Sequence, residues 1–235
     1  MADAKRAIIK DVYNNPRTGF GSIADTLRQA RLRDRNIKRS DVTSFLETVK
    51  QREDRPQRGY NRYVPVEPMH QVQVDLADMS VFSTAPYRYM LAAIDSFTKK
   101  TTAVPLASKT AKATAEAWKK VVQTLGIPSN VYSDDGAEFK AEFAKKLEGL
   151  DVDKLVTRGH AFFVERVIRT IKEALVRRLA AGVVPRNRWH QLLPDVLAQY
   201  NSRTHAGTGT TPDKAYKDPA AANKAREVMA RPRRG

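Results

Sequence analysis

Apolar residues recur at two different spacings along this chain, and the spacing changes near residue 69. Before that point, Ile23, Leu27 and Ala30 lie three or four residues apart, which predicts an amphipathic helix that Ser22 can cap. A helix near residues 4–13 precedes it, and Ser40 can cap another over residues 40–51. We therefore expect a small helical domain at the start of the chain.

After residue 69 the pattern becomes that of strands and helices. The segment HQVQVDLADM alternates, with Val72, Val74 and Leu76 on one face and Gln73, Asp75 and Ala77 on the other. Further apolar strands are expected at YMLAAID, TTAVPLA, SNVYS and KLVTR, and helices at 109–126, 138–149, 161–181 and 187–203. Hairpin-type strands followed by strands that alternate with helices predict an α/β fold with a mixed sheet.

Residues 52–68 lack apolar periodicity and are rich in proline, arginine and glycine, which is typical of a linker. Arg58 and Arg62 alternate there with Tyr60 and Tyr63, a mixture that suits nucleic-acid contact but equally suits a solvated tether. The predicted organisation is a helical domain over 1–51, a basic linker over 52–68, an α/β core over 69–219 and a basic tail over 220–235. The helical domain is either a helix-turn-helix-like DNA binder or a plain helical bundle.

Composition narrows the class of function. The net charge of +16 and the pI of about 10.1 favour a polyanionic partner, and nucleic acid is the first candidate. Charge alone would equally suit a ribosomal or packaging protein. The absence of cysteine excludes disulfides, thiol catalysis and cysteine-ligated zinc. Neither a secretory leader nor a membrane-spanning apolar run is evident, so we expect no membrane partner and an intracellular protein or one carried in a particle.

Three acidic residues occur in contexts that can bring them together. Asp75 lies in the alternating strand, Asp134 opens the turn SDDGAEF after a short strand, and Glu165 heads the helical segment VERVIRTIKEAL. Converged carboxylates repel one another unless divalent cations neutralise them, which is the chemistry of metal-dependent phosphoryl transfer. Each acid also has an ordinary interpretation as a strand, turn or solvated helix residue, and Asp78 and Asp135 are the alternatives to Asp75 and Asp134.

Two cations accompany Glu165 on one helical face. Arg169 and Lys172 follow it at i+4 and i+7, where they can contact phosphates beside a metal ligand.

These segments, in their order, resemble a known family. VDLADM, YSDDGAEF, FFVERVIRTIKEAL and the tail NSRTHAGTGTTPDKAY are similar to the integrase catalytic core of retroviruses, retrotransposons and Maverick or Polinton transposons. SDDG resembles the family's "DNG" turn, VERVIRTIK its "ERxxRTLK" helix, and HAGTGTTPDKA its "H…G.TP" tail. The N-terminal part resembles the Maverick-type enzymes more than the retroviral ones.

The resemblance implies a ribonuclease H-like fold with a mixed five-stranded sheet, two Mg²⁺ or Mn²⁺ ions and polynucleotidyl transfer on double-stranded DNA rather than on a small molecule. It identifies Asp75, Asp134 and Glu165 as the catalytic, metal-binding triad. One of the two ions would activate the nucleophile, and the other would stabilise the leaving oxygen. It implies 3′-end processing and strand transfer. DNA phosphates would be held by Arg169, Lys172, Lys109 and Arg158, with Arg58 and Arg62 on the linker.

The resemblance also has departures and competitors. Ala161-Phe162-Phe163 replaces the family's usual small polar residues before the glutamate, and the gap from Asp134 to Glu165 is shorter than usual. A homo-oligomer, dimer or tetramer, is expected, built partly through the helices around Trp118 and Trp189, although both can be core residues. The nucleus of the host cell or a virus-like particle is the expected location. A nuclease without transfer activity and a catalytically inactive DNA-binding relic are the alternatives.

Overall fold

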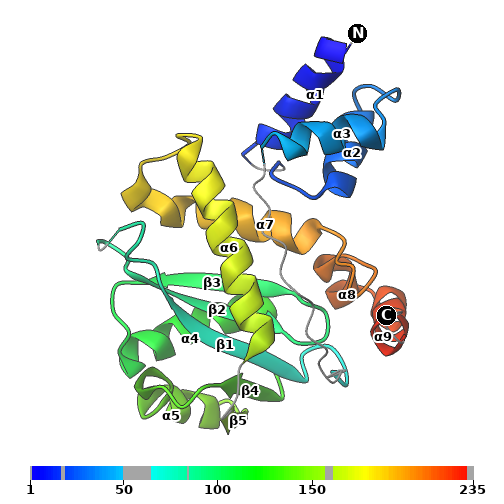
Figure 1. The fold of residues 1–235 in the computed structure, drawn as a ribbon. Coiled ribbons are helices and arrows are strands. Elements are labelled where there is room, and N and C mark those ends of the chain that lie inside the picture. The colour runs from blue at the N-terminus through cyan, green and yellow to red at the C-terminus, as the bar shows by residue number, and fades with distance from the viewer. Residues whose placement is uncertain (1, 17–18, 50–64, 84, 157–160, 232–235) are drawn as a thin grey trace. The chain divides into compact units, whose positions relative to one another are not determined.

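The chain divides into two units, residues 1–63 and 64–235. The computed structural model describes residues 2–16, 19–49, 65–83, 85–156 and 161–231 (Figure 1). Each unit has an apolar core of its own and is treated separately.

The N-terminal unit is helical, as predicted. Its helices are α1 (Ala2–Asn14), α2 (Ile23–Arg31) and α3 (Arg39–Glu47). Ser22 caps α2 by accepting a hydrogen bond from the Asp25 N–H at 3.2 Å, also as predicted. The predicted cap of α3 is wrong: the Asp41 carboxylate accepts from the Lys38 N–H at 2.8 Å, so the helix begins before Ser40. The core of the unit gathers around Tyr13, which contacts the rings of Phe20 and Phe45 edge-on.

The second unit is built on a mixed five-stranded sheet of strand order β3-β2-β1-β4-β5, which confirms the predicted ribonuclease H-like class. Strands β1, β2 and β3 form an antiparallel meander, whereas β4 pairs parallel to β1 and β5 parallel to β4. Short connections suffice for the antiparallel strands, and helices make the parallel crossovers. The strands are β1 (Gln71–Asp78), β2 (Tyr89–Asp95), β3 (Thr101–Leu106), β4 (Asn130–Ser133) and β5 (Asp153–Val156).

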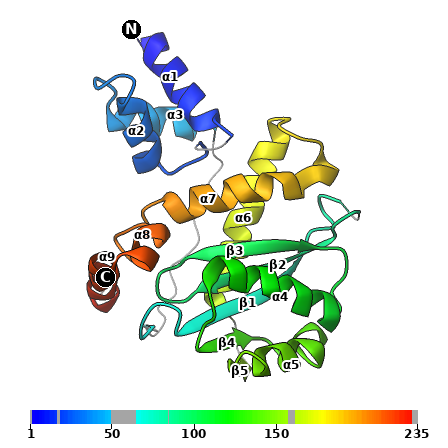
Figure 2. The same cartoon turned by 180° about the vertical axis from the view of Figure 1, so that it is seen from behind.

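Helices cover both faces of this sheet (Figures 1 and 2). Val72 and Val74 of β1 pack in the cluster that contains α4 and α5, while Ala77 packs in the cluster that contains α6 and α7. The predicted alternation is therefore correct, but both faces of β1 are buried. The elements are α4 (Ala111–Leu125), a 3₁₀ turn (Ala137–Phe139) and α5 (Glu142–Glu148) on one face, and α6 (Phe162–Ala180), a 3₁₀ segment (Arg186–Leu192) and α7 (Leu193–Ser202) on the other.

The two tryptophans belong to these clusters. Trp118 lies in the α4 cluster and Trp189 in the α7 cluster, and both side chains are fully buried. They are core residues, so the indoles themselves offer no surface to another copy of the chain.

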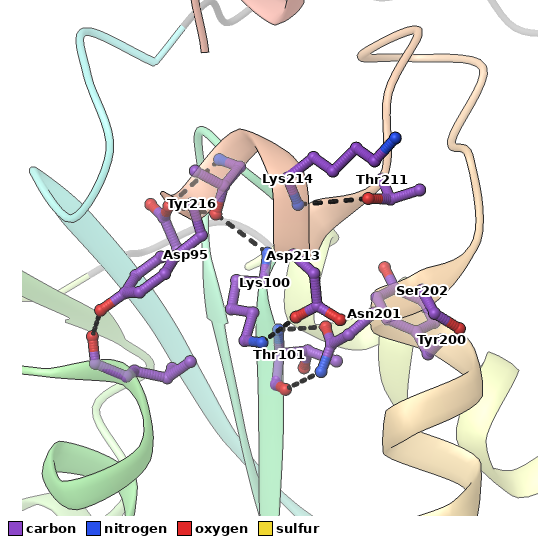
Figure 3. A network of polar contacts seen from close by, with 12 residues as sticks. Asp95, Lys100, Thr101, Tyr200, Asn201, Ser202, Thr211, Asp213, Lys214 and Tyr216 are labelled. Carbon is purple, nitrogen blue, oxygen red and sulfur yellow. Dashed lines mark hydrogen bonds and ion pairs between the residues drawn. The ribbon is translucent and has the colours of Figure 1, made fainter. Parts of the chain in front are cut away.

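The C-terminal segment returns to the edge of the sheet at β3. The Asn201 side chain accepts from the Thr101 N–H at 3.0 Å and donates to the Thr101 carbonyl at 2.8 Å. Lys100 pairs with Asp213 of α8 (Pro212–Lys217), and Thr211 caps that helix (Figure 3). The tail motif HAGTGTTPDKA is thus a fold-back that fastens α8 to β3.

The predicted basic tail is in fact partly a packed helix. Residues Pro219–Ala230 form α9, and its Ala225 and Met229 are buried against Phe97 and Ala215. Ala222, Ala225 and Met229 recur at helical spacing, which explains why this basic segment is ordered on the unit. No helix within the described ranges is both long and apolar enough to cross a bilayer.

Candidate active site

Asp75 and Asp134 lie on neighbouring parallel strands. In the register of β1 and β4, Gln73 is opposite Tyr132. Asp75 and Asp134 each follow two residues later, so the parallel register places them at the same level, where β4 ends. The carboxyl end of a parallel strand is the usual place for a site in an α/β sheet.

The third acid arrives on α6, whose N-terminus is held against β1. The side-chain oxygen of Gln73 accepts from the N–H of Phe163 at 3.0 Å and from the N–H of Val164 at 3.3 Å. Glu165 lies in that same first turn of α6 and is partly exposed. The turn that carries Glu165 is therefore tied to the strand that carries Asp75.

The charges of these acids act on one another. The pKa of Asp75 is raised to about 6, chiefly by burial, with smaller upward contributions from the carboxylates of Asp134, Glu165 and Glu138. A hydrogen bond from the Leu76 N–H acts in the opposite direction. The structure thus brings Asp134 and Glu165 within electrostatic reach of Asp75, and a proton or a cation on Asp75 relieves the repulsion.

The alternative acids are engaged elsewhere. Asp78 is exposed, accepts from the Ser80 N–H at 2.7 Å and pairs with Arg88 at 3.4 Å, and the bonds from Ser80 lower its pKa. Asp135 pairs with Lys140 at 3.1 Å. These contacts favour Asp75 and Asp134 over their neighbours.

Glu138 is a fourth acid that sequence reasoning missed. It lies in the 3₁₀ turn after Asp134, and a Cβ added to Gly136 would stand 2.8 Å from its carboxylate and 2.9 Å from Oδ1 of Asp134. Both carboxylates therefore lie close to the place that a side chain at residue 136 would occupy. The available signal was the spacing in DDGAEF, since a helical turn after Gly136 returns residue 138 towards residue 134.

Replacement of Gly136 by alanine tests this close approach. The new methyl group would displace the Asp134 and Glu138 carboxylates, so we expect G136A to be less stable than the wild type by about 1 kcal/mol. Thermal unfolding measures the effect, with Gly207→Ala as control, because a Cβ at Gly207 meets no atom within 4 Å. Equal unfolding temperatures for both variants would contradict the crowding at Gly136.

Two of the predicted DNA-binding cations lie beside Glu165 in the structure. Arg169 and Lys172 line a shallow groove on α6 together with Glu165, as their spacing predicted. Lys109 is exposed in the loop after β3, on the other side of β2 and β1 from Asp134. Arg158, Arg58 and Arg62 lie outside the described residues.

A further cation was not predicted. Lys154 of β5 donates to the Phe139 carbonyl and interacts electrostatically with Asp134 and Asp135. Burial lowers the pKa of Lys154 despite these acids. One lysine of β5 thus lies within electrostatic reach of the acidic cluster.

The donor set agrees with Mg²⁺ or Mn²⁺ in chemistry. Asp75, Asp134 and Glu165 supply hard carboxylate oxygens, the ligands these ions prefer, and a cation would offset both the burial and the neighbouring negative charges that raise the pKa of Asp75. Within the described residues, no three side chains of His, Asp or Glu are close enough to hold one ion as they stand. Asp75 and Asp134 each accept a backbone N–H locally, from Leu76 at 2.7 Å and Gly136 at 3.0 Å.

Comparison with known proteins agrees with this geometry. Residues 65–160 match the integrase core domain family. The chain is 29% identical over 145 residues to the Gag-Pol polyprotein of Walleye dermal sarcoma virus, covering 59% of this chain and 8% of the polyprotein. It spans less than half the length of the curated relatives that it matches.

Solved structures show the same fold. The HTLV-2 integrase catalytic core domain in complex with magnesium, in a trimeric form, superposes with a TM-score of 0.56 at 19% identity, covering 64% of this chain and 98% of that one. A simian T-cell lymphotropic virus intasome in complex with the PP2A regulatory subunit B56 gamma gives a TM-score of 0.60 at 18% identity, covering 78% and 66%.

Proposed function

Because residues 65–160 match the integrase core domain family, we propose that the protein is a DNA integrase or transposase. Its reaction is metal-dependent trimming of a DNA 3′ end and transfer of that end into target DNA. The observation that supports the proposal is that the carboxylates of Asp134 and Glu165, which come from other elements, both act on Asp75 of β1.

The proposed metal ligands are the three acids. Asp75, Asp134 and Glu165 would hold Mg²⁺ or Mn²⁺, which supply Lewis-acid activation of the nucleophile and neutralisation of the leaving oxygen. Asp75 is partly buried and its pKa is raised, so a cation would stabilise its ionised carboxylate.

The DNA surface proposed here begins at the triad and follows α6. Arg169 and Lys172 lie along the same groove as Glu165, which suits a phosphate backbone leading into the site. In the N-terminal unit, Arg35, Lys38 and Arg39 are exposed between α2 and α3, where a second DNA contact is proposed. Integration at paired ends requires that two DNA ends be held at once, so we propose a homo-oligomer, by analogy with the intasome of the simian virus.

A strand-joining assay tests the function. Duplex DNA with a recessed 3′ end, a supercoiled target and Mn²⁺ should give covalently joined products with the full chain. Cleavage without joining would support a nuclease, and DNA binding with neither reaction would support an inactive relic. Either result would overturn the proposal.

The origin of the element and the location of the protein remain predictions. The Maverick-type likeness of the N-terminal part, and a site of action in the nucleus or in a virus-like particle, follow from the resemblance noted above. The viral polyprotein relative fits carriage in a particle.

A further inference from the structure

Helix α6 has no capping side chain of its own. Its N-cap residue is Ala161, which makes no side-chain cap hydrogen bond. The first N–H groups of a helix have no partner inside that helix and need an acceptor from elsewhere. The side-chain oxygen of Gln73 accepts two of them, at Phe163 and Val164.

Gln73 is a buried residue of β1 close to Asp75. Its side chain is 3% exposed, on the same face of β1 as Asp75 two residues later. The N–H groups that it accepts belong to the two residues immediately before Glu165. One buried amide therefore joins the backbone next to Glu165 to the strand of Asp75.

A second contact involves the same first turn of α6. Lys99, in the turn between β2 and β3, places its Nζ 3.2 Å from the centre of the Phe163 ring and donates to the Ser96 carbonyl. The rings of Phe162 and Phe163 lie 4.3 Å apart. The aromatic pair that departs from the family pattern is thus part of the anchorage of α6, with Phe163 fixed by Gln73 through its N–H and by Lys99 through its ring.

We propose that Gln73 is a positioning residue of the proposed strand-transfer reaction, on which this inference rests: by capping α6 from β1, it sets Glu165 relative to Asp75. It touches no reacting atom. Its loss leaves the carboxylates in the chain but removes the link that keeps α6 in register with β1.

The test compares Gln73→Met, which keeps the length of the side chain and removes the acceptor, with Gln73→Glu, which keeps the acceptor. Gln71→Met is the matched control, because it removes an equally buried amide from the same face of β1, farther from Asp75. The measurements are the kcat and KM of strand joining, Mn²⁺ binding by calorimetry, and amide hydrogen exchange at Phe163 and Val164.

For Q73M we expect kcat to fall about 100-fold with KM for DNA nearly unchanged, since a displacement of about 1 Å costs that much. Mn²⁺ affinity should fall about tenfold, as for groups that orient metal ligands. Exchange at Phe163 and Val164 should accelerate at least about tenfold. Q73E should keep the exchange protection, and Q71M should resemble the wild type.

The proposal is overturned if Q73M keeps wild-type kcat, Mn²⁺ affinity and exchange, or if Q71M shows the same losses. If Q73M does not fold, Q73N, whose amide is one methylene shorter, replaces it and the same outcomes decide. A wild-type protein that joins no DNA would overturn the proposed function instead, while exchange and Mn²⁺ binding would still decide whether Gln73 places Glu165.

Discussion

Replacement of Glu165 by glutamine should abolish strand transfer, with a loss of at least about 1000-fold in joining rate, and leave DNA binding largely intact. The substitution keeps the size and hydrogen-bonding length of the side chain but removes the negative charge that a divalent ion needs. Joining of a recessed 3′ end measures the rate, and a titration of the same duplex without divalent ions measures binding.

Glu173→Gln is the matched control for this loss. Glu173 lies on the same helix, lines the same groove and pairs with Arg177 at 3.5 Å, so its substitution changes the net charge by the same amount. We expect E173Q to join DNA within about threefold of the wild type, because exposed ion pairs contribute little. Undiminished joining by E165Q would refute the assignment of the triad.

Asp75→Asn should stabilise the metal-free protein at neutral pH. The folded-state pKa of Asp75 is about 6, above the ordinary value of 3.8, so the folded state binds the proton more tightly than the unfolded state does. The ionised carboxylate therefore costs stability that is present above pH 6 and disappears as the pH falls through 6 towards 3.8. The cost is at most about 3 kcal/mol, which asparagine would remove.

Thermal unfolding in a chelator measures this gain. At pH 7.5 we expect D75N to melt roughly 5–10 °C above the wild type, with the difference shrinking at pH 4.5. Asp78→Asn is the control, since the pKa of Asp78 is lowered and its carboxylate accepts from Ser80, so neutralisation should bring no gain. A pH-independent difference in D75N would contradict the burial of its charge, and Mn²⁺ should stabilise the wild type but not D75N.

The local patterns in the sequence predicted the elements of the sheet and the position of the acids well. The alternation around Val72 and Val74 placed Asp75 on the opposite face of its strand, and the apolar segment before Asp134 placed that residue at a strand end. Such patterns depend on neighbours in the chain, which is why they can be read without a structure.

Contacts between distant segments could not be predicted in the same way. The cap that Gln73 provides to α6 joins residues 90 positions apart, and it depends on the rotamer of one amide. The packing of α9 depends on Phe97, which lies in a turn between two strands. The absence of a capping side chain at Ala161 was the visible hint that an acceptor would come from another element.

The two hydrogen bonds between Asn201 and Thr101 affect how copies of the chain can associate when they lie close together. An outer strand offers unpaired N–H and C=O groups to which a strand of another chain can add. At Thr101, on the outer strand β3, both backbone groups are occupied by one side-chain amide. When many copies bind side by side on a polyanion, a strand of another copy therefore cannot pair with β3 at Thr101. The contact that fastens the C-terminal segment thus also opposes aggregation through this edge.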